Sequence, residues 1–233
     1  MGLRTARIIV AATLGLLLGC GQGAPRNATG RPAGDTDTVG AARPVVSAAG
    51  QPTIVFLGTS LTAGLGLDPD SAYPALVQHK IDSAGLRYTV VNAGVSGESS
   101  AGALRRIDWV LRQPPALLVL ETGANDGLRG QSPDSVRANI QTMLDRIRAA
   151  SPSTRVVLTG MEAMPNLGAD YVHRFRAIFP ALAAQNHLPL IPFLLAGVAG
   201  VDSLNQQDGI HPNPAGSRII AITVWRTLSP LLR

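Results

Sequence analysis

The sequence predicts an α/β fold, a three-layer α/β/α sandwich around a parallel sheet of about five strands. Short apolar runs alternate with longer segments whose apolar residues recur at helical spacing, as in successive βα units. Several of the runs end abruptly in Gly, Asn or Ser. Such ends are typical of the carboxyl edge of a parallel sheet, where open α/β folds bind ligands.

Five apolar runs are the predicted strands. Leu117–Glu121 is almost wholly aliphatic, as expected for a strand buried on both faces of a sheet. The other four are Thr53–Leu57, Tyr88–Asn92, Val156–Thr159 and Leu188–Pro192.

Five amphipathic segments are the predicted helices. In one of them Ser132 is expected as the N-cap, with Pro133 in the first turn. Trp109 falls outside the apolar stripe of its own helix. The segments are Ala72–Ala84, Ser99–Leu111, the helix that Ser132-Pro133 opens with an apolar stripe through Ile147, Asp170–Gln185, and the closing helix that starts at Pro212-Asn213-Pro214 and runs through Leu228.

The N-terminal residues differ in composition from the rest. Two arginines precede Ile8–Leu18, an apolar run too short to span a bilayer comfortably, and Leu17-Leu18-Gly19 leads into the only cysteine, Cys20. This arrangement resembles the lipobox of bacterial lipoproteins. Residues 1–19 are therefore predicted to be a signal peptide, cleaved before a lipidated Cys20. An ordinary signal peptide with a chance cysteine, and an uncleaved anchor, are the alternatives.

Residues 20–51 are rich in small and polar residues without apolar periodicity, which predicts a flexible tether. The folded unit is then residues 52–233, a normal size for one domain. Five of the 20 basic and two of the 15 acidic residues lie before Pro52, which leaves 15 basic against 13 acidic residues in the domain. This balance, with few aromatics and no basic run, argues against a nucleic-acid partner.

Ser60 is the candidate nucleophile, because it directly follows the first predicted strand in Gly58-Thr59-Ser60-Leu61. In Asp208-Gly209-Ile210-His211-Pro212, the carboxylate can accept a hydrogen bond from Nδ1 of the imidazole and leave Nε2 as a base. Taken alone, the pair is better explained by a helix cap and a surface histidine. Together with Ser60, Asp208 and His211 would form an acyl-transfer triad.

Two further residues are candidate oxyanion donors. Gly97 would offer a backbone N–H at a tight turn, and Asn125, in Gly123-Ala124-Asn125-Asp126, would offer a side-chain amide. Amides are preferred as oxyanion donors, because they donate hydrogen bonds without carrying a charge that must be neutralised. Ordinary turn chemistry is the alternative for each residue.

Ser60 in its turn, Gly97, Asn125, and Asp208 with His211 resemble, in order and spacing, the four blocks of the SGNH (GDSL-type) hydrolases. The likeness spans nearly the whole domain and is greatest for the bacterial arylesterase, thioesterase I and lysophospholipase group. It implies a flavodoxin-like sandwich and a cofactor-independent serine esterase. Ser60 would attack, His211 would take the proton and Asp208 would hold the imidazole. The Ser60 and Gly97 N–H groups and the Asn125 amide would receive the oxyanion.

The resemblance has one departure. The family usually reads Gly-Asp-Ser-Leu, whereas this chain has Thr59 in place of that aspartate, which is not the triad acid. The loop Met161–Gly168 also resembles the segment that covers the acyl chain in this group. Its apolar side chains would suit an acyl group, unless they simply pack in the core: Met161, Met164, Pro165 and Leu167.

The sequence therefore predicts an esterase acting on short- to medium-chain acyl esters, thioesters or lysolipids, tethered through Cys20 to a bacterial cell-envelope membrane. The enzymatic alternative is a carbohydrate esterase that deacetylates envelope polysaccharide. The other is a lipid- or glycan-binding lipoprotein with a vestigial triad, for which Thr59 is the best support.

Other chemistry finds little support in the sequence. No Cys/His cluster has metal-ligand spacing, and no glycine-rich phosphate loop follows a strand. Glu98 and Glu121 adjoin the predicted site, but nothing shows the flanking geometry of a glycosidase acid pair. The remaining histidines are expected at the surface or in packing: His79, His173 and His187.

Overall fold

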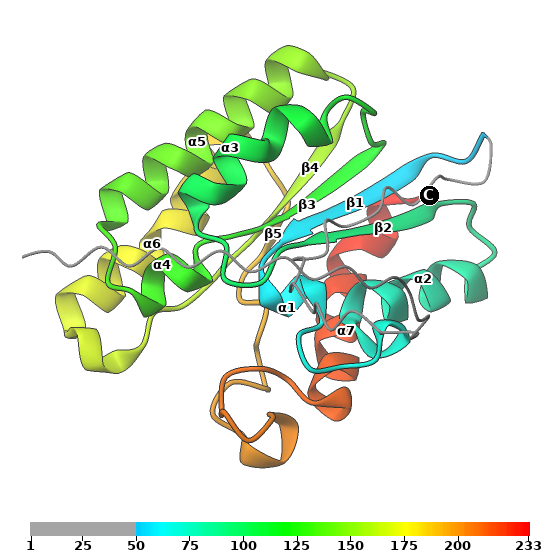
Figure 1. Cartoon of the computed structure of the whole chain (residues 1–233). Helices are drawn as coiled ribbons and strands as arrows, with labels where there is room; N and C mark the ends of the chain where they lie inside the picture. Colours follow the sequence, from blue (N-terminus) through cyan, green and yellow to red (C-terminus); the bar gives the residue numbers. More distant parts are fainter. Residues whose placement is uncertain (1–49) are drawn as a thin grey trace, which may run out of the picture. The chain divides into compact units, whose positions relative to one another are not determined.

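The computed structural model describes residues 50–233, so the predicted signal peptide, Cys20 and most of the predicted tether lie outside the described residues. One parallel sheet has the strand order β2-β1-β3-β4-β5 (Figure 1). The predicted α/β fold with a five-stranded parallel sheet is confirmed. The strands are β1 (Thr53–Gly58), β2 (Thr89–Gly94), β3 (Leu117–Glu121), β4 (Arg155–Thr159) and β5 (Leu190–Ile191).

The register of the sheet fixes where its loops emerge. β1 lies between β2 and β3, and Gly58 at its end pairs with Gly94 of β2. On the other side, Leu57 pairs with Leu120 of β3. The carboxyl ends of these three strands are therefore level, and the turns that follow them lie side by side.

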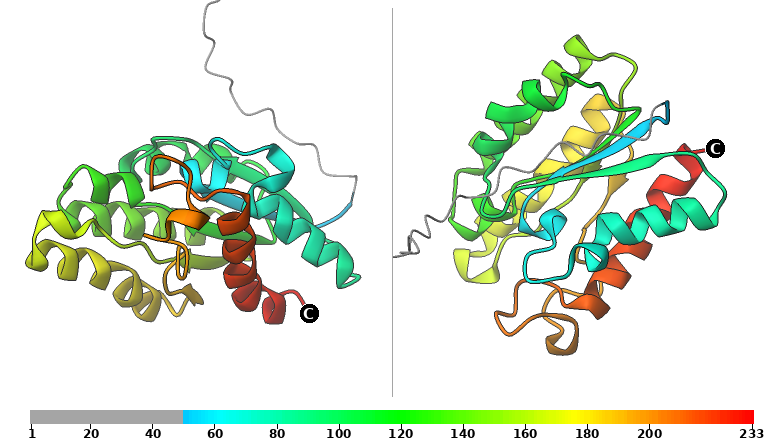
Figure 2. Two further views of the ribbon diagram at one scale, coloured as in Figure 1. Left: turned by 90° about the horizontal axis from the view of Figure 1, so that it is seen from below. Right: turned by 45° about the vertical axis from the view of Figure 1, so that its right-hand side comes forward.

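Helices on both sides complete three layers. Figures 1 and 2 show α3 (Ser100–Val110), α5 (Pro133–Ala150) and α6 (Ala169–Asn186) on one face, and α2 (Tyr73–Ser83) and α7 (Pro214–Leu228) on the other. All five residues of β3 are buried between these layers, as its aliphatic sequence predicts. None of the helices within residues 50–233 has the length and apolarity needed to cross a bilayer.

Two short helices were not predicted. α1 (Ser60–Ala63) and α4 (Ala124–Leu128) begin within three residues of the ends of β1 and β3. Their four and five residues are too few to show an apolar period, so the sequence indicates only turns there.

The predictions of a helix cap and of an exposed tryptophan can be compared with the structure. Ser132 is the N-cap residue of α5, which begins at Pro133 as predicted, but the Ser132 side chain makes no capping hydrogen bond. Caps do form at Ser99, whose Oγ accepts from the Gly102 N–H, and at Asn213 before α7. Trp109 is half exposed, as its place outside the apolar stripe predicts.

Candidate active site

Ser60 lies where β1 gives way to α1, and its side chain is almost buried. It is the first residue of α1, so its N–H has no acceptor within the helix. Its Oγ lies 2.9 Å from Nε2 of His211, and Nδ1 of the same ring lies 2.6 Å from Oδ2 of Asp208. The structure thus brings together the three side chains that the sequence singled out as a triad.

Asp208 is held in place by its own loop. Its Oδ1 accepts hydrogen bonds from the backbone N–H groups of Ile210 and His211, both at 2.9 Å. These bonds leave Oδ2 for the imidazole. The bonds from the His211 backbone and ring, followed by the bond from Ile210, lower the pKa of Asp208 to about 2. Asp208 is therefore a carboxylate at neutral pH, which favours the tautomer of His211 that carries its proton on Nδ1.

The loop that carries Asp208 and His211 joins β5, at the far edge of the sheet, to α7. In Figure 1 it is the orange segment below α1. Gln206 fixes it to the Ser60 turn, because its amide donates to the carbonyl of Leu65 at 2.7 Å. Ser217, in the first turns of α7, donates to the carbonyl of Ser71 at 2.6 Å. These two hydrogen bonds hold the loop that follows β5 against the residues that follow β1.

Gly97 lies in the turn after β2, with a φ of 78° that favours glycine. This turn is tied to the end of β1, since the Val95 N–H donates to the Gly58 carbonyl at 2.8 Å. Arg106 of α3 strengthens the tie: its guanidinium binds both carboxylate oxygens of Glu98 at 2.7 Å and also donates to the Gly58 carbonyl at 3.3 Å. Sequence reasoning did not find Arg106, because a lone arginine on a helix carries no pattern.

Asn125 lies in the first turn of α4. Gly123, with a φ of 94°, turns the chain out of the end of β3 and into this helix. One N–H of the Asn125 amide donates to the backbone carbonyl of Glu98 at 3.0 Å. Asn125 therefore adjoins the turn of Gly97, and the candidate donors come from three neighbouring strand ends.

The two glutamates near the site are held by internal partners. The Glu98 carboxylate pairs with Arg106, and the Glu121 carboxyl is fully buried and accepts hydrogen bonds from Thr59. Within residues 50–233, no group of three or more His, Cys, Asp or Glu side chains lies together as a metal site would require. The three other histidines are exposed: His79, His173 and His187.

The apolar side chains of the loop Met161–Gly168 differ in their exposure to solvent. Met161 is buried and belongs to the hydrophobic core, as the alternative of core packing requires. Met164 is 46% exposed, Pro165 is exposed and Leu167 is half-buried, so these three side chains remain available to a bound molecule.

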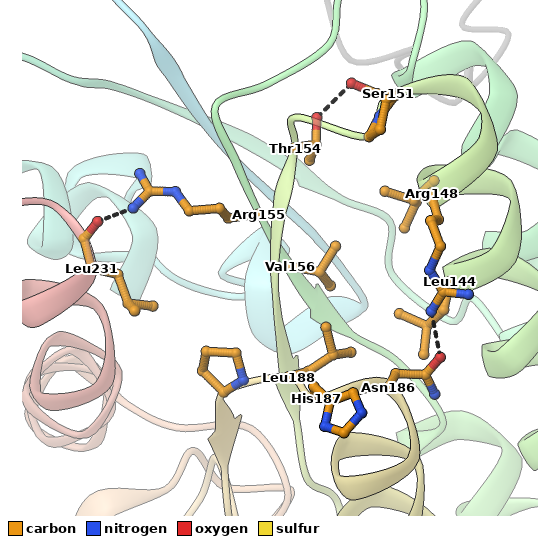
Figure 3. A pocket seen from close by; sticks show the side chains of 13 residues that line it. Leu144, Arg148, Ser151, Thr154, Arg155, Val156, Asn186, His187, Leu188 and Leu231 are labelled. Atoms are coloured by element: carbon orange, nitrogen blue, oxygen red, sulfur yellow. Dashed lines mark hydrogen bonds between the residues drawn. The ribbon is translucent and has the colours of Figure 1, made fainter.

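A small cavity lies beside the Ser60 hydroxyl. The cavity that Ser60 and His211 both line has about 10 Å³, room for roughly one water molecule. Cavities of about 840 and 320 Å³ lie toward the amino ends of the strands, and the second is lined by Thr154, Arg155 and His187 (Figure 3). The edge that carries Ser60 is the opposite one, so neither larger cavity belongs to this site.

Known proteins are similar to this chain in sequence. Residues 56–219 match the GDSL-like Lipase/Acylhydrolase family. Esterase TesA of Pseudomonas aeruginosa is 42% identical over 181 residues, which are 77% of this chain and 89% of TesA. Thioesterase 1/protease 1/lysophospholipase L1 of Escherichia coli is 36% identical over 186 residues, 79% of this chain and 87% of that protein.

A solved structure gives the same result for the fold. The psychrotrophic esterase EstA from Pseudoalteromonas sp., inhibited by monoethylphosphonate, superposes with a TM-score of 0.73 at 32% identity, covering 78% of this chain and 98% of EstA. The resemblance found in the sequence is confirmed: the chain belongs to the GDSL-like lipase/acylhydrolase family and is an ester hydrolase.

Proposed function

We propose that the chain is a serine esterase that cleaves short- to medium-chain acyl esters, thioesters or lysolipids through Ser60, His211 and Asp208. The observation that carries the proposal is the 2.9 Å separation between Ser60 Oγ and His211 Nε2. A serine is a weak nucleophile unless an adjacent base takes its proton, and this distance is within direct transfer range.

In the proposed first half-reaction, Ser60 Oγ attacks the acyl carbon while its proton passes to Nε2 of His211. The imidazolium then protonates the leaving alcohol or thiol, which leaves an acyl-Ser60 ester. In the second half-reaction a water molecule takes the place of Ser60 Oγ, and the acid and free Ser60 are released. Asp208 stays ionised throughout, because the hydrogen bonds from His211 and Ile210 hold its pKa at about 2.

The proposed oxyanion donors are the N–H groups of Ser60 and Gly97 and the amide of Asn125. Asn125 uses one N–H for the Glu98 carbonyl, which fixes the plane of the amide and leaves the second N–H for the substrate. Preorganised donors of this kind stabilise the charge that develops in the transition state.

Exposed apolar side chains support a substrate with an acyl chain. Six of the eight large apolar side chains that are exposed within residues 50–233 lie after the carboxyl ends of the strands, at the same edge as Ser60. Because the cavity beside Ser60 is too small for an acyl group, the acyl chain of the substrate would lie across this open edge of the sheet. The six are Leu65, Val95, Leu128, Met164, Val201 and Ile210. The names of the relatives, an esterase and a thioesterase/lysophospholipase, agree with this substrate class.

A substrate panel tests the proposal. Purified protein is assayed with p-nitrophenyl acetate, butyrate and octanoate, an acyl thioester, a lysophospholipid and acetylated sugars. We expect the largest kcat/KM among the acyl esters of short or medium length. A clear preference for acetylated sugars would instead support a carbohydrate esterase.

A second experiment tests the alternative that the protein binds lipid or glycan and has no catalytic activity. We expect a fluorophosphonate to label Ser60 covalently, since EstA, with the same fold, is inhibited by a phosphonate. Protein that stays unlabelled while a control esterase reacts would favour the binding alternative.

We also propose that a lipid on Cys20 tethers the domain to a bacterial envelope membrane. The support is the sequence Leu17-Leu18-Gly19-Cys20 after an apolar run. A Cys20→Ser variant is expected to move from the membrane fraction to the soluble fraction of the envelope. Unchanged membrane association would contradict lipidation.

A further inference from the structure

Glu121, the last residue of β3, holds the turn that carries Ser60. Its carboxyl group is fully buried. The Thr59 N–H donates to Oε2 at 2.6 Å, and the Thr59 hydroxyl donates to Oε1 at 2.9 Å. The Thr62 hydroxyl donates to Oε2 at 2.9 Å. One carboxyl group from the neighbouring strand therefore binds the residue before Ser60 and the residue two positions after it.

A carboxyl group is costly in this place. The rest of β3 is aliphatic and buried, and burial raises the pKa of Glu121, although hydrogen bonds from Thr59 and Thr62 offset part of this effect. The Thr59 N–H and the hydroxyls of Thr59 and Thr62 are buried donors, and Glu121 supplies the acceptor that each of them needs. All three donors belong to residues within two positions of Ser60, so the carboxyl group acts on the turn that carries Ser60.

Other bonds restrain the backbone on either side of Ser60: the Val95 N–H and Arg106 donate to the Gly58 carbonyl, and the Asn92 amide donates to the Thr62 carbonyl. Glu121 adds the bonds to the Thr59 N–H and to the two threonine hydroxyls. Only Thr59 separates the end of β1 from Ser60, and the Thr59 side chain makes no capping bond to α1. On the far side, the hydroxyls of Thr62 and Tyr73 lie 2.7 Å apart, which links the network to α2. Rotation of this turn would displace both the Ser60 hydroxyl and the Ser60 N–H, because both belong to the same residue.

We propose that Glu121 is a positioning residue for the esterase reaction. Through Thr59 and Thr62 it fixes the Ser60 Oγ against His211 and aims the Ser60 N–H at the oxyanion, without touching the substrate. The inference rests on the proposed function. A displacement of about 1 Å at a reacting atom lowers the rate about 10²-fold, and this is the size of effect that loss of the contacts should have.

Two substitutions separate the hydrogen bonds from the bulk of the side chain. In Glu121→Gln the amide oxygen can still accept from the Thr59 N–H and the Thr62 hydroxyl, and the amide nitrogen can donate to Thr59 Oγ1. Glu121→Leu keeps a similar volume and loses every bond. We expect Glu121→Leu to lower kcat about 10²-fold with little change in KM. Glu121→Gln should restore most of the kcat.

Thr154→Val is the matched control. The Thr154 hydroxyl is buried and donates to the Pro115 carbonyl at 2.7 Å, at the amino end of the sheet. Its loss should lower the melting temperature and leave kcat unchanged. In all variants of the full chain, kcat is referred to the number of reactive serines, counted with a fluorophosphonate, and thermal unfolding is measured on the same samples.

The outcomes are distinct. Glu121→Leu with a lowered melting temperature and a wild-type kcat per reactive serine would overturn the inference. So would a Glu121→Gln enzyme as slow as Glu121→Leu, because Gln keeps the bonds. If Glu121→Leu does not fold, the double variant Glu121→Gln/Thr59→Val decides. It leaves the amide nitrogen without the Thr59 oxygen, and a kcat no lower than that of Glu121→Gln would contradict the inference. Wild-type protein that neither reacts with the label nor cleaves any ester would refute the proposed function itself.

Discussion

The Ser60 hydroxyl lies 2.9 Å from Nε2 of His211, although 151 residues separate them in the chain. Ser60 follows the central strand β1, whereas His211 arrives from the edge strand β5 through a long loop. Gln206 and Ser217 hold that loop against residues that follow α1. The contact therefore exists before substrate binds, so no rearrangement is needed to bring the proposed base, His211, to the proposed nucleophile, Ser60.

Ser60→Ala should abolish ester hydrolysis and leave the fold intact, since the side chain loses only its contact with His211. The readouts are turnover of a p-nitrophenyl ester, labelling by a fluorophosphonate and thermal unfolding. Ser83→Ala is a suitable control: this exposed serine on α2 donates only to the backbone of its own helix. Turnover that survives in Ser60→Ala at the wild-type rate would assign the nucleophile elsewhere.

Asn125→Ala should lower kcat by about 10²–10³ and change KM little, because the oxyanion forms mainly in the transition state. Steady-state kinetics with one acyl ester measure both constants. Asn186→Ala removes a part-buried amide at the end of α6, far from Ser60, and serves as the control. Full kcat in the Asn125 variant would remove this residue from the mechanism.

The sequence predicts the strands well because burial on both faces leaves a strong signal. Leu117–Glu121 is found with the predicted bounds, and the ends of the other strands differ from the prediction by at most two residues. The short helices α1 and α4 escape because single helical turns of glycine and polar residues have no period. Ser132 takes the predicted N-cap position, but residue preference does not show whether its side chain bonds to the helix, and here it does not.

The candidate site likewise has residues that the sequence can predict and residues that it cannot. Ser60, Asp208 and His211 stand out as chemical groups in short motifs, so the sequence can pair them before any geometry is known. The supports of the site do not stand out. Arg106 reaches the Gly58 carbonyl across 48 residues, and Glu121 reaches Thr59 across 62. For Glu121 one signal was visible: an acid ends an otherwise aliphatic, buried strand.

Asp208 gives a prediction for the dependence on pH. In the folded protein the pKa of Asp208 is about 2, below its value in the unfolded chain. The ionised side chain therefore stabilises the fold at any pH above the unfolded pKa, and this stabilisation is lost as the pH falls toward 2. Asp208→Asn lacks the contribution. The stability difference between the two proteins should therefore shrink from pH 6 to pH 2, as urea unfolding can measure. The effect is small, because the side chain is 46% exposed. A difference that is constant over this range would contradict the lowered pKa.

The same pKa bears on activity. Because Asp208 remains ionised above about pH 2, its protonation cannot cause a loss of kcat/KM between pH 4 and 9. Any loss of kcat/KM toward acid within that range should therefore persist without protonation of Asp208. Asp208→Asn should lower kcat by up to about 10⁴, since the wrong tautomer of His211 is then favoured.

Thr59→Asp introduces the aspartate that is usual in the family, and here it should reduce stability. The Thr59 hydroxyl oxygen lies 2.9 and 3.0 Å from the two Glu121 oxygens, so the new carboxyl group would adjoin a buried one. Two carboxylates this close cannot both ionise, and the pair would retain a proton with a raised pKa. A carboxyl group with a raised pKa contributes stability below its unfolded pKa and loses it as the pH rises. The melting temperature of Thr59→Asp should therefore fall further below wild type from pH 5 to pH 9. Thr59→Asn, of equal size without the charge, should show no such trend, and parallel curves for the two variants would contradict the coupling between position 59 and Glu121.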